Sequence, residues 1–206
     1  AQLCSVTSDI GVDAVKTGML SSAPLVHRIS DLLGDLQLSN LVVDPVMIAK
    51  GGHQLLSEDA VSAVRNRLIP LAKVVTPNLH EAAVLAGRPV STIEDMRAVA
   101  RELCSGDDQV IVIKGGHLEQ TDEAVDVAFD GKILHHLSSS RTATSNTHGT
   151  GCTFSAAIAA SLAQGLSTLA AVRKAKSYVS AAIRQSLQLG AGHGPTQHMA
   201  DVRTPW

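Results

Sequence analysis

Short, uninterrupted apolar runs recur along this chain, and they limit how it can fold more than any other feature. The clearest are NLVVDPV (40–46), KVVTPN (73–78) and QVIVIKGG (109–116). A strand that is apolar at successive positions has to be buried on both faces, which is typical of a parallel sheet covered by helices. The sequence therefore predicts an α/β fold, with a mostly parallel sheet and helices on both faces.

Stretches with helical periodicity separate and follow these runs. The pattern predicts helices over 57–72, 91–104, 150–164 and 168–188. The second of them opens with Ser91 and Glu94 at the spacing of a capping box, so we expect that helix to begin there.

Two further segments carry strand signals. VDAVKTGML (12–20) predicts a strand that ends in a glycine turn. EAVDVAFDGKILHHLSS (123–139) alternates apolar and polar residues on both sides of Asp130-Gly131, which is a strong signal for a β-hairpin. We expect this antiparallel hairpin at the edge of the sheet or as a flap over it. No linker or internal repeat divides the sequence, so a single domain is predicted.

The composition argues against several classes of partner. The chain has 17 Lys and Arg against 19 Asp and Glu, a net charge of −2 and 2% aromatic residues. Nucleic-acid-binding surfaces need clustered basic side chains and often stacking rings, so no nucleic-acid partner is expected. Cys4, Cys104 and Cys152 are widely spaced, which implies no disulfide framework and favours a reducing, cytoplasmic location. The most apolar stretch, 154–169, is interrupted by polar residues, so we expect no membrane partner.

Polar residues beside Gly or Pro follow several of the predicted strands. In open α/β sheets, ligands bind beyond the carboxyl ends of the strands. We therefore expect the following segments to meet at one rim of the sheet, together with the loop before Cys152: 16–19, 44, 76–81 and 114–116.

The segment NTHGTGCTFSAAIAA (146–160) is a glycine-spaced loop that runs into a helix. Consecutive N–H groups at Gly149, Thr150 and Gly151, backed by a helix N-terminus, could cradle a phosphoryl group. An ordinary helix cap with a small buried cysteine at Cys152 would give the same pattern. The chain has neither GxxxxGK(S/T) nor GxGxxG, so the usual P-loop and dinucleotide fingerprints are excluded.

Two acidic residues lie where a metal ion could bind. Mg²⁺ bound with a nucleotide takes one or two carboxylates and phosphate oxygens, and Asp44 and Glu81 are the candidates. Asp44 could instead cap the turn before Pro45, and Glu81 could stabilise the first turn of a helix. Asn78, three residues before Glu81, favours a site. Lys114 can meet phosphates, or its stem could simply carry its charge to solvent.

Taken together, these motifs resemble a known family. VKTGML, VVDPVM, VVTPNLHEAAVLAG, VIVIKGGH, NTHGTGCTFSAAIAA and GAGHGP occur in the order seen in the hydroxymethylpyrimidine/phosphomethylpyrimidine kinases of thiamin biosynthesis, members of the ribokinase superfamily. The resemblance runs from about Asp9 to Met199. It implies a ribokinase-like fold and an enzyme that uses ATP and Mg²⁺. The substrates would be hydroxymethylpyrimidine and then its monophosphate, in a homodimer.

The resemblance also implies roles for individual residues. Cys152 matches the catalytic base, because a thiolate at a helix N-terminus is stabilised and can accept the proton of an alcohol. The other matches are Gly149, Thr150 and Gly151 to the anion hole, Asp44 and Glu81 to the magnesium–phosphate cluster, Asn78 to the same motif as Glu81, Lys114 to a phosphate-side lysine, and Met19 to a residue that packs on the pyrimidine ring.

The chain departs from the family pattern at its start. Family members begin with strands and a glycine-rich turn that precede the first residue here, so the resemblance implies a single ribokinase-like domain over 1–206 that lacks its N-terminal strands. Hydroxyethylthiazole kinases also use GTG followed by Cys, and pyridoxal kinases share the architecture. A non-catalytic module that binds a pyrimidine or a nucleotide is a further alternative. The pair KTGML and DPVM favours the pyrimidine kinase.

Overall fold

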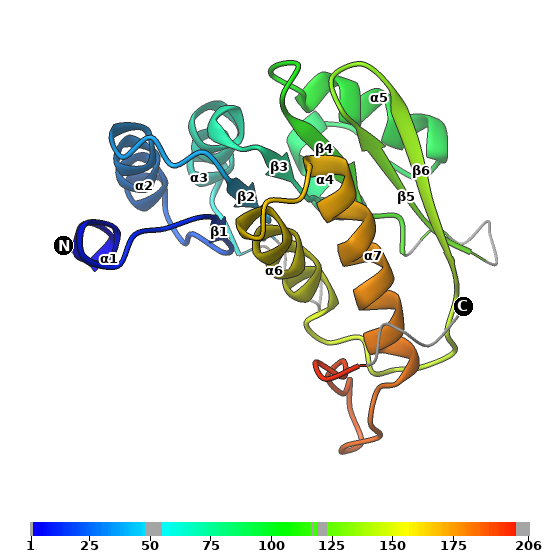
Figure 1. The fold of residues 1–206 in the computed structure, drawn as a ribbon. Coiled ribbons are helices and arrows are strands. Elements are labelled where there is room, and N and C mark those ends of the chain that lie inside the picture. Colours follow the sequence, from blue (N-terminus) through cyan, green and yellow to red (C-terminus); the bar gives the residue numbers. More distant parts are fainter. Residues whose placement is uncertain (1, 48–54, 117, 119–122, 201–206) are drawn as a thin grey trace.

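The structure is a computed structural model, and it describes residues 2–47, 55–116, 118 and 123–200. Within these residues one sheet contains six strands, which lie side by side in chain order (Figure 1). They are β1 (Val15–Thr17), β2 (Leu41–Val43), β3 (Val74–Val75), β4 (Val110–Ile113), β5 (Glu123–Phe129) and β6 (Leu134–Ser140). The first four are parallel, whereas β5 and β6 are antiparallel to their neighbours. The predicted, mostly parallel sheet with an antiparallel hairpin at its edge is confirmed.

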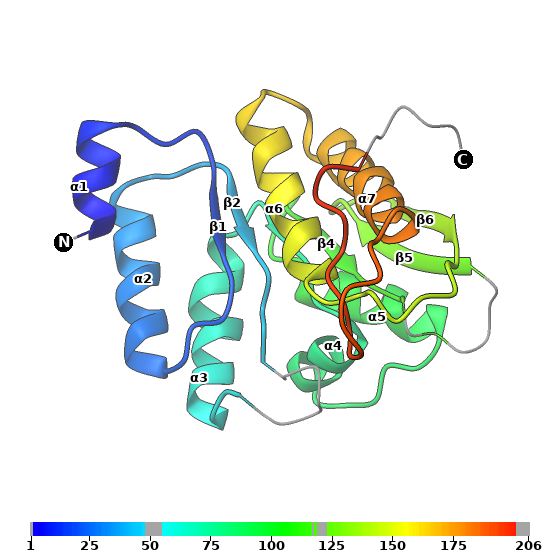
Figure 2. The ribbon, with the colours of Figure 1, turned by 90° about the horizontal axis from the view of Figure 1, so that it is seen from below.

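The continuous apolar strands divide their side chains between two cores, as the sequence predicts. Val43 and Ile111 belong to one core, and their neighbours Val42 and Val110 belong to the other. The first core lies under α2 (Ala23–Asp35), α3 (Glu58–Ala63), α4 (Leu79–Ala86) and α5 (Ile93–Leu103), and the second lies under α6 (Thr150–Ala163) and α7 (Thr168–Arg184). Figure 2 shows β1 and β2 side by side with α2 to one side of them and α6 to the other.

Two helix predictions need correction. The single helix expected over 57–72 is divided into α3, a π-helical turn at Val64–Leu68 and a 3₁₀ turn at Ile69–Leu71. Pro70 explains the end of the regular helix, because proline lacks an N–H and its ring clashes with the carbonyl four residues earlier.

The capping box of α5 lies one residue later than predicted. The Thr92 side chain accepts the Asp95 N–H at 3.1 Å, and the Asp95 carboxylate accepts the Thr92 N–H at 2.9 Å. Asp95 also accepts the Ser91 N–H at 3.0 Å, while Glu94 pairs with Arg97. The Asp95 carboxylate accepts two N–H groups, so capping by Thr92 and Asp95 is favoured over capping by Ser91 and Glu94.

Three helices lie outside the sequence prediction: α1 (Gln2–Asp9), α2 and α4. The signal for α2 was present, because a proline stands in its first turn and Val26 and Leu33, seven residues apart, are buried. Among the described residues, no helix is long and apolar enough to cross a membrane.

The hairpin joining β5 and β6 forms where Asp130-Gly131 predicts it. Gly131 has φ +87°, a left-handed conformation that favours glycine. The Asp130 carboxylate accepts the N–H groups of Lys132 and Ile133 and pairs with His135 at 2.7 Å. The turn packs on the segment before β4, at the opposite end of the sheet from the rim where the candidate site residues gather.

Candidate active site

Asp44 is the centre of the predicted rim. It follows β2 directly, its N–H donates to the Thr17 carbonyl at 3.1 Å, and its side chain is 2% exposed. Lys114, which follows β4, places its Nζ 3.0 Å from Asp44 Oδ1. Lys16 of β1 places its Nζ 3.9 Å from Asp44 Oδ2. A buried carboxylate needs such partners. Here they come from the ends of two other parallel strands, β1 and β4.

Two hydroxyl groups complete the surroundings of Asp44. Thr76 Oγ1 donates to Asp44 Oδ1 at 3.3 Å, and Ser155 Oγ lies 3.2 Å from Asp44 Oδ2. Ser155 belongs to α6, so this contact ties the helix behind the glycine loop to the strand ends. The side chain of Asp44 is therefore occupied by lysines and hydroxyls, and the alternative of a simple turn cap does not describe it.

Glu81 and Asn78 open helix α4 as a reciprocal capping box. Asn78 Oδ1 accepts the Glu81 N–H at 2.9 Å, and Glu81 Oε2 accepts the Asn78 N–H at 2.8 Å. The helix-start reading of Glu81 is thus correct, and it does not exclude a second role. Burial raises the pKa of the Glu81 carboxyl, and the charge of Asp44 adds to the rise, whereas Lys114 and the N–H groups of Asn78 and Met47 oppose it.

These two carboxylates fit a magnesium ion that is shared with phosphates. Within the described ranges, no group of three His, Cys, Asp or Glu side chains could hold a metal by itself. Mg²⁺ usually takes one or two carboxylates and completes its shell with phosphate oxygens and water. Asp44 raises the cost of charge on Glu81, and a divalent cation beside both would relieve that repulsion.

The glycine loop before α6 enters the helix through a left-handed residue. Gly149 is the N-cap of α6 with φ +80°, and Thr150 Oγ1 donates to the Thr147 carbonyl at 2.8 Å. A Cβ at Gly151 would lie 3.0 Å from Lys114 Nζ, so the lysine lies against the loop and a side chain at Gly151 would displace its ammonium group. Cys152 is exposed in the first helical turn, where N–H groups lack intrahelical acceptors. The alternative of an ordinary helix cap with a small buried cysteine does not hold for Cys152, because this side chain is exposed.

The turn after β4 is fixed by two residues that sequence reasoning missed. Asp126 of β5 accepts the Gly115 N–H at 3.0 Å, and Lys176 of α7 pairs with Asp126 at 2.8 Å. A Cβ at Gly115 would lie 2.1 Å from the Val125 carbonyl oxygen. The turn is therefore held by backbone contact and by a buried ion pair, and it fixes the direction of Lys114.

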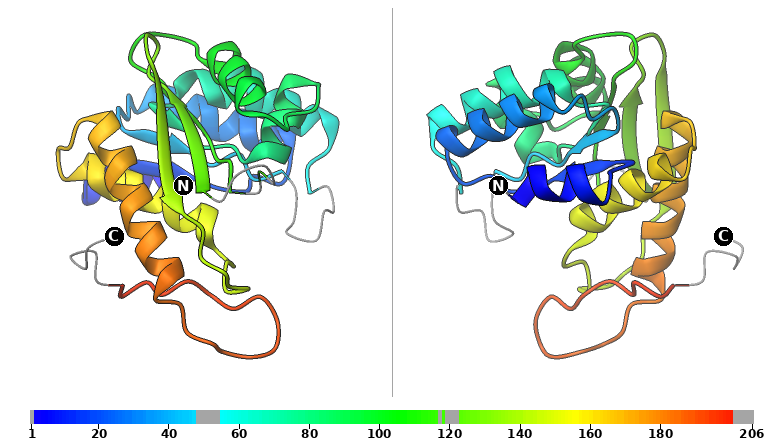
Figure 3. Two further views of the ribbon diagram at one scale, coloured as in Figure 1. Left: turned by 90° about the vertical axis from the view of Figure 1, so that its right-hand side faces the viewer. Right: turned by 60° about the vertical axis from the view of Figure 1, so that its left-hand side comes forward.

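The segment after α7 holds the glycine loop from the other side. The His148 N–H donates to the Gly194 carbonyl at 3.0 Å, and the buried Asn146 side chain donates to the Leu187 carbonyl at 3.1 Å. A Cβ at Gly194 would lie 2.3 Å from Asn146 Oδ1. Figure 3 shows this segment looping beyond the end of α7. The glycines of GAGHGP were the signal for this close approach, but their partner could not be read from the sequence.

Comparison with known proteins decides the family. The family model described as phosphomethylpyrimidine kinase matches residues 1–197. The chain belongs to the phosphomethylpyrimidine kinase family. The resemblance expected from the sequence motifs is confirmed.

Curated relatives of this family member come from two pathways. The thiamine biosynthesis bifunctional protein of Geobacter sulfurreducens is 49% identical over 98% of this chain, which spans only 42% of that protein. A Bacillus subtilis pyridoxine kinase is 42% identical over 97% of the chain, which spans 74% of it. The hydroxymethylpyrimidine/phosphomethylpyrimidine kinase of the same organism is 39% identical over 98% of the chain, and again 74% of the relative is spanned.

Solved structures confirm the ribokinase-like fold. The ADP complex of Bacillus subtilis pyridoxal kinase superposes with a TM-score of 0.90 and 42% identity, over 97% of this chain and 75% of that one. The Staphylococcus aureus pyridoxal kinase in complex with AMP-PCP and pyridoxal gives a TM-score of 0.87 and 37% identity, over 97% and 71%. Nucleotides therefore bind to close structural neighbours of this kinase-family chain.

Met19 is the last of the predicted site residues. It is 52% exposed, beside Gly18 at the end of β1. An exposed methionine at the rim is available to a ligand, and its predicted packing on a pyrimidine ring remains a prediction.

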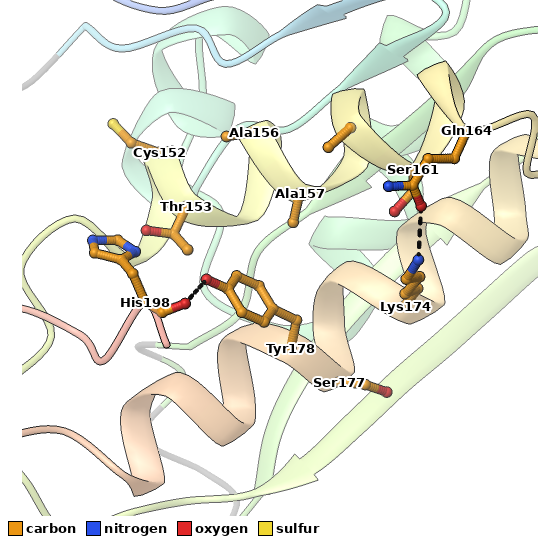
Figure 4. A pocket seen from close by; sticks show the side chains of 11 residues that line it. Cys152, Thr153, Ala156, Ala157, Ser161, Gln164, Lys174, Ser177, Tyr178 and His198 are labelled. Atoms are coloured by element: carbon orange, nitrogen blue, oxygen red, sulfur yellow. Dashed lines mark hydrogen bonds between the residues drawn. The ribbon is translucent and has the colours of Figure 1, made fainter. Parts of the chain in front are cut away.

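A cavity of about 790 Å³ lies between α6 and α7, with Cys152 in its lining (Figure 4). Small side chains of α6 form one wall. Tyr178 of α7, whose hydroxyl donates to the His198 carbonyl at 2.8 Å, lines the other. Asp44, Glu81 and Lys114 are not among its lining residues. The cavity therefore adjoins the rim through Cys152, and the charged groups of the site lie outside it.

Proposed function

We propose that this chain is the kinase domain that transfers the γ-phosphoryl group of ATP to hydroxymethylpyrimidine and then to its monophosphate, in thiamin biosynthesis. The observation that carries the proposal is the arrangement around Gly151. The exposed Cys152 follows it, Gly149 caps the helix in a left-handed conformation, and Lys114, fixed by Asp44, lies against it. Relatives that carry out this activity by name cover nearly the whole chain.

The first transfer follows from these groups. The N–H groups of the loop at Gly149, Thr150 and Gly151 would donate to the phosphoryl oxygens, and Lys114 would neutralise the phosphates. The substrate hydroxyl oxygen forms a bond to the γ-phosphorus, the bond to the β–γ bridging oxygen breaks, and ADP leaves. Cys152 Sγ takes the hydroxyl proton, because it is exposed where the acceptor has to approach.

Asp44 and Glu81 would hold Mg²⁺ together with the phosphates, and Asn78 would assist at the same place. An ion held by these residues would supply positive charge to the phosphates. The Asp44 contacts with Lys114 and Ser155 keep these groups oriented before a nucleotide arrives. On the acceptor side, Met19 would pack on the pyrimidine ring.

A pyridoxal kinase is the second candidate, and one observation favours it. The TM-score of 0.90 is against a pyridoxal kinase, with 42% identity. The two candidates share the phosphate machinery, so the acceptor alone separates them.

The deciding experiment is a panel of acceptors with Mg²⁺ and ATP: hydroxymethylpyrimidine, its monophosphate, pyridoxal and hydroxyethylthiazole. ADP formation and phosphorylated products are measured for the chain alone and for the chain preceded by the strands that the resemblance places upstream. Turnover of both pyrimidines supports the proposal. Turnover of pyridoxal alone replaces it with the second candidate, and no turnover in either form overturns it in favour of a non-catalytic module.

The proposal extends to location and assembly. A cytoplasmic homodimer that binds neither nucleic acid nor membrane is consistent with the net charge of −2 and with the family. Sedimentation velocity at several protein concentrations measures the oligomeric state, and a monomer at all of them contradicts this part.

A further inference from the structure

Two lysine ammonium groups face the same buried carboxylate, and the mechanism above uses only one of them. Lys114 Nζ lies 3.0 Å from Asp44 Oδ1, within hydrogen-bond distance. Lys16 Nζ lies 3.9 Å from Asp44 Oδ2, which is an ion pair but too long for a hydrogen bond. That contact uses none of the three N–H donors of Lys16, whose side chain is 23% exposed. Lys16 can therefore donate to an incoming anion while it stays beside Asp44.

The two ammonium groups lie against different parts of the rim. A Cβ at Gly151 would lie 3.0 Å from Lys114 Nζ, and a Cβ at Gly18 would lie 2.9 Å from Lys16 Nζ. Gly151 belongs to the loop that we assign to the phosphates of ATP. Gly18 precedes Met19, which we assign to the ring of the acceptor. Lys16 is therefore on the acceptor side of the rim.

We propose that Lys16 binds the phosphate group of a monophosphorylated acceptor and thereby permits the second phosphoryl transfer. This inference rests on the proposed function, and it assigns one residue to one of the two transfers. It distinguishes a kinase that makes a diphosphate from one that stops at the monophosphate.

The chemistry of the second transfer explains why a cation is needed there. An oxygen of the acceptor phosphate forms a bond to the γ-phosphorus of ATP, the bond to the β–γ bridging oxygen breaks, and ADP leaves. A phosphate monoester carries a charge of about −1.5 to −2 at neutral pH, so two anions have to approach each other. The hydroxyl acceptor of the first transfer is neutral. A lysine on the acceptor side therefore reduces a repulsion that only the second transfer meets.

The test compares the two pyrimidine acceptors in three variants and a control. For Lys16→Met, we expect the KM of the monophosphate to rise about 10- to 100-fold, the scale of one lost charge-assisted hydrogen bond. The KM of the free alcohol should change less than about threefold. Lys16→Arg should retain most of the second activity, because the guanidinium also binds phosphate. Lys132→Met, which removes an exposed lysine on the hairpin turn, should change neither KM.

Gly18→Ala tests the same position without removing a charge. The added methyl group meets only the far end of the flexible Lys16 side chain, so the fold should persist while the ammonium group moves. We expect a smaller rise in the KM of the monophosphate and an unchanged circular dichroism spectrum. An equal change for both acceptors in Lys16→Met and Gly18→Ala overturns the proposal, because it would reduce Lys16 to a partner of Asp44.

Calorimetric binding of the monophosphate gives a readout that needs no turnover. Weaker binding by Lys16→Met than by the parent, with restoration by Lys16→Arg, supports the proposal even if the chain alone is inactive. Equal binding by the parent and Lys16→Met overturns it. Failure of the proposed function is seen separately, as absence of phosphorylation of the free alcohol.

Discussion

The turn after β4 and the loop before α6 both contain glycines near Lys114, and the two segments need glycine for different reasons. In the turn after β4, a Cβ at Gly115 would meet the Val125 carbonyl oxygen at 2.1 Å, and Asp126 binds its N–H. In the loop before α6, no atom lies within 4 Å of a Cβ at Gly149, but its φ is +80°. One glycine is required by space and the other by backbone conformation.

The steric requirement at Gly115 and the conformational requirement at Gly149 imply that the two segments differ in rigidity. In the lysine turn, Gly115 is buried against Val125 and Met96, and the ion pair with Asp44 orients the Lys114 ammonium group before a ligand binds. In the glycine loop, the space beside Gly149 is open and Cys152 is exposed, so this part of the loop is accessible to a ligand. Substitutions in the packed turn should affect stability first, and substitutions in the open loop should affect activity first.

Cys152→Ala should have the largest effect, and on activity alone. Loss of the base should lower kcat for the free alcohol by about 10²- to 10⁴-fold, whereas the side chain is exposed and the free energy of unfolding should change by less than about 0.5 kcal/mol. The loss should be smaller with the monophosphate, because a monoester above its second pKa of about 6 has no proton to give up. Steady-state kinetics with both acceptors measure this, with Cys4→Ala as the control. Equal losses for both acceptors would contradict a role as base.

Gly115→Ala should lower the free energy of unfolding by about 3 kcal/mol or more, because a backbone oxygen cannot move aside cheaply. Urea denaturation measures it. The matched control is Gly116→Ala, where nothing lies within 4 Å of the added methyl group and the change should stay below about 0.5 kcal/mol. Similar losses in the two variants would show that the close approach of the Val125 carbonyl is not what requires glycine at position 115.

Gly149→Ala should cost about 1–2 kcal/mol, the strain of a left-handed residue with a Cβ. Gly165, which follows α6 with φ +83° and nothing within 4 Å of an added Cβ, provides the matched control. Both Ala variants should lose similar stability in urea denaturation, while only Gly149→Ala should lose kinase activity. Equal activity of the two variants would show that the loop at Gly149 does not bind the phosphoryl group.

Asp130→Asn should have the smallest effect, confined to stability. The hydrogen bond with His135, with further help from the Ile133 and Lys132 N–H groups, lowers the pKa of Asp130 from 3.8 to about 2. A lowered pKa means that the ionised form stabilises the fold above pH 3.8 and that this contribution is lost as the pH falls through about 2. At pH 7 the variant should lose less than about 1 kcal/mol, since the turn is partly exposed. A difference in unfolding free energy that persists unchanged at pH 2, or lower kinase activity, would contradict this.

The parts of the fold that the sequence predicts are those with a local signal. Buried strands such as Val110–Ile113 and the Asp130-Gly131 turn carry their own pattern, so they were found. The regular helix expected over 57–72 fails where Pro70 interrupts it, although the breaker was visible in the sequence. Helix α4 was not predicted as an element, although the alternative role of Glu81 in a first helical turn indicated its start. The structure shows that Asn78 and Glu81 cap this helix.

The position of the candidate site at the strand ends could be predicted from the sequence, but the contacts that support it could not. The rule that ligands bind beyond the carboxyl ends of parallel strands brought Asp44 and Lys114 together correctly, and their ion pair is 3.0 Å long. The support from Asp126, Lys176 and Gly194 could not be predicted, because each contact joins segments far apart in the chain. Such contacts depend on the packing of α7 and of the segment behind it, about which a local pattern contains no information.

The close packing of Gly194 on Asn146 joins two segments that are synthesised at different times. Ribosomes add about 5–20 residues per second, so Gly194 emerges several seconds after the glycine loop it holds. The sheet, α6 and the Asp44 contacts can form before then, since all their residues precede this segment. At that stage the nascent chain already contains the residues of both cores, but the glycine loop before α6 lacks its contact with Gly194. The glycine loop before α6 therefore gains its contacts with the Gly194 segment only after the elements on both sides of the loop have been synthesised.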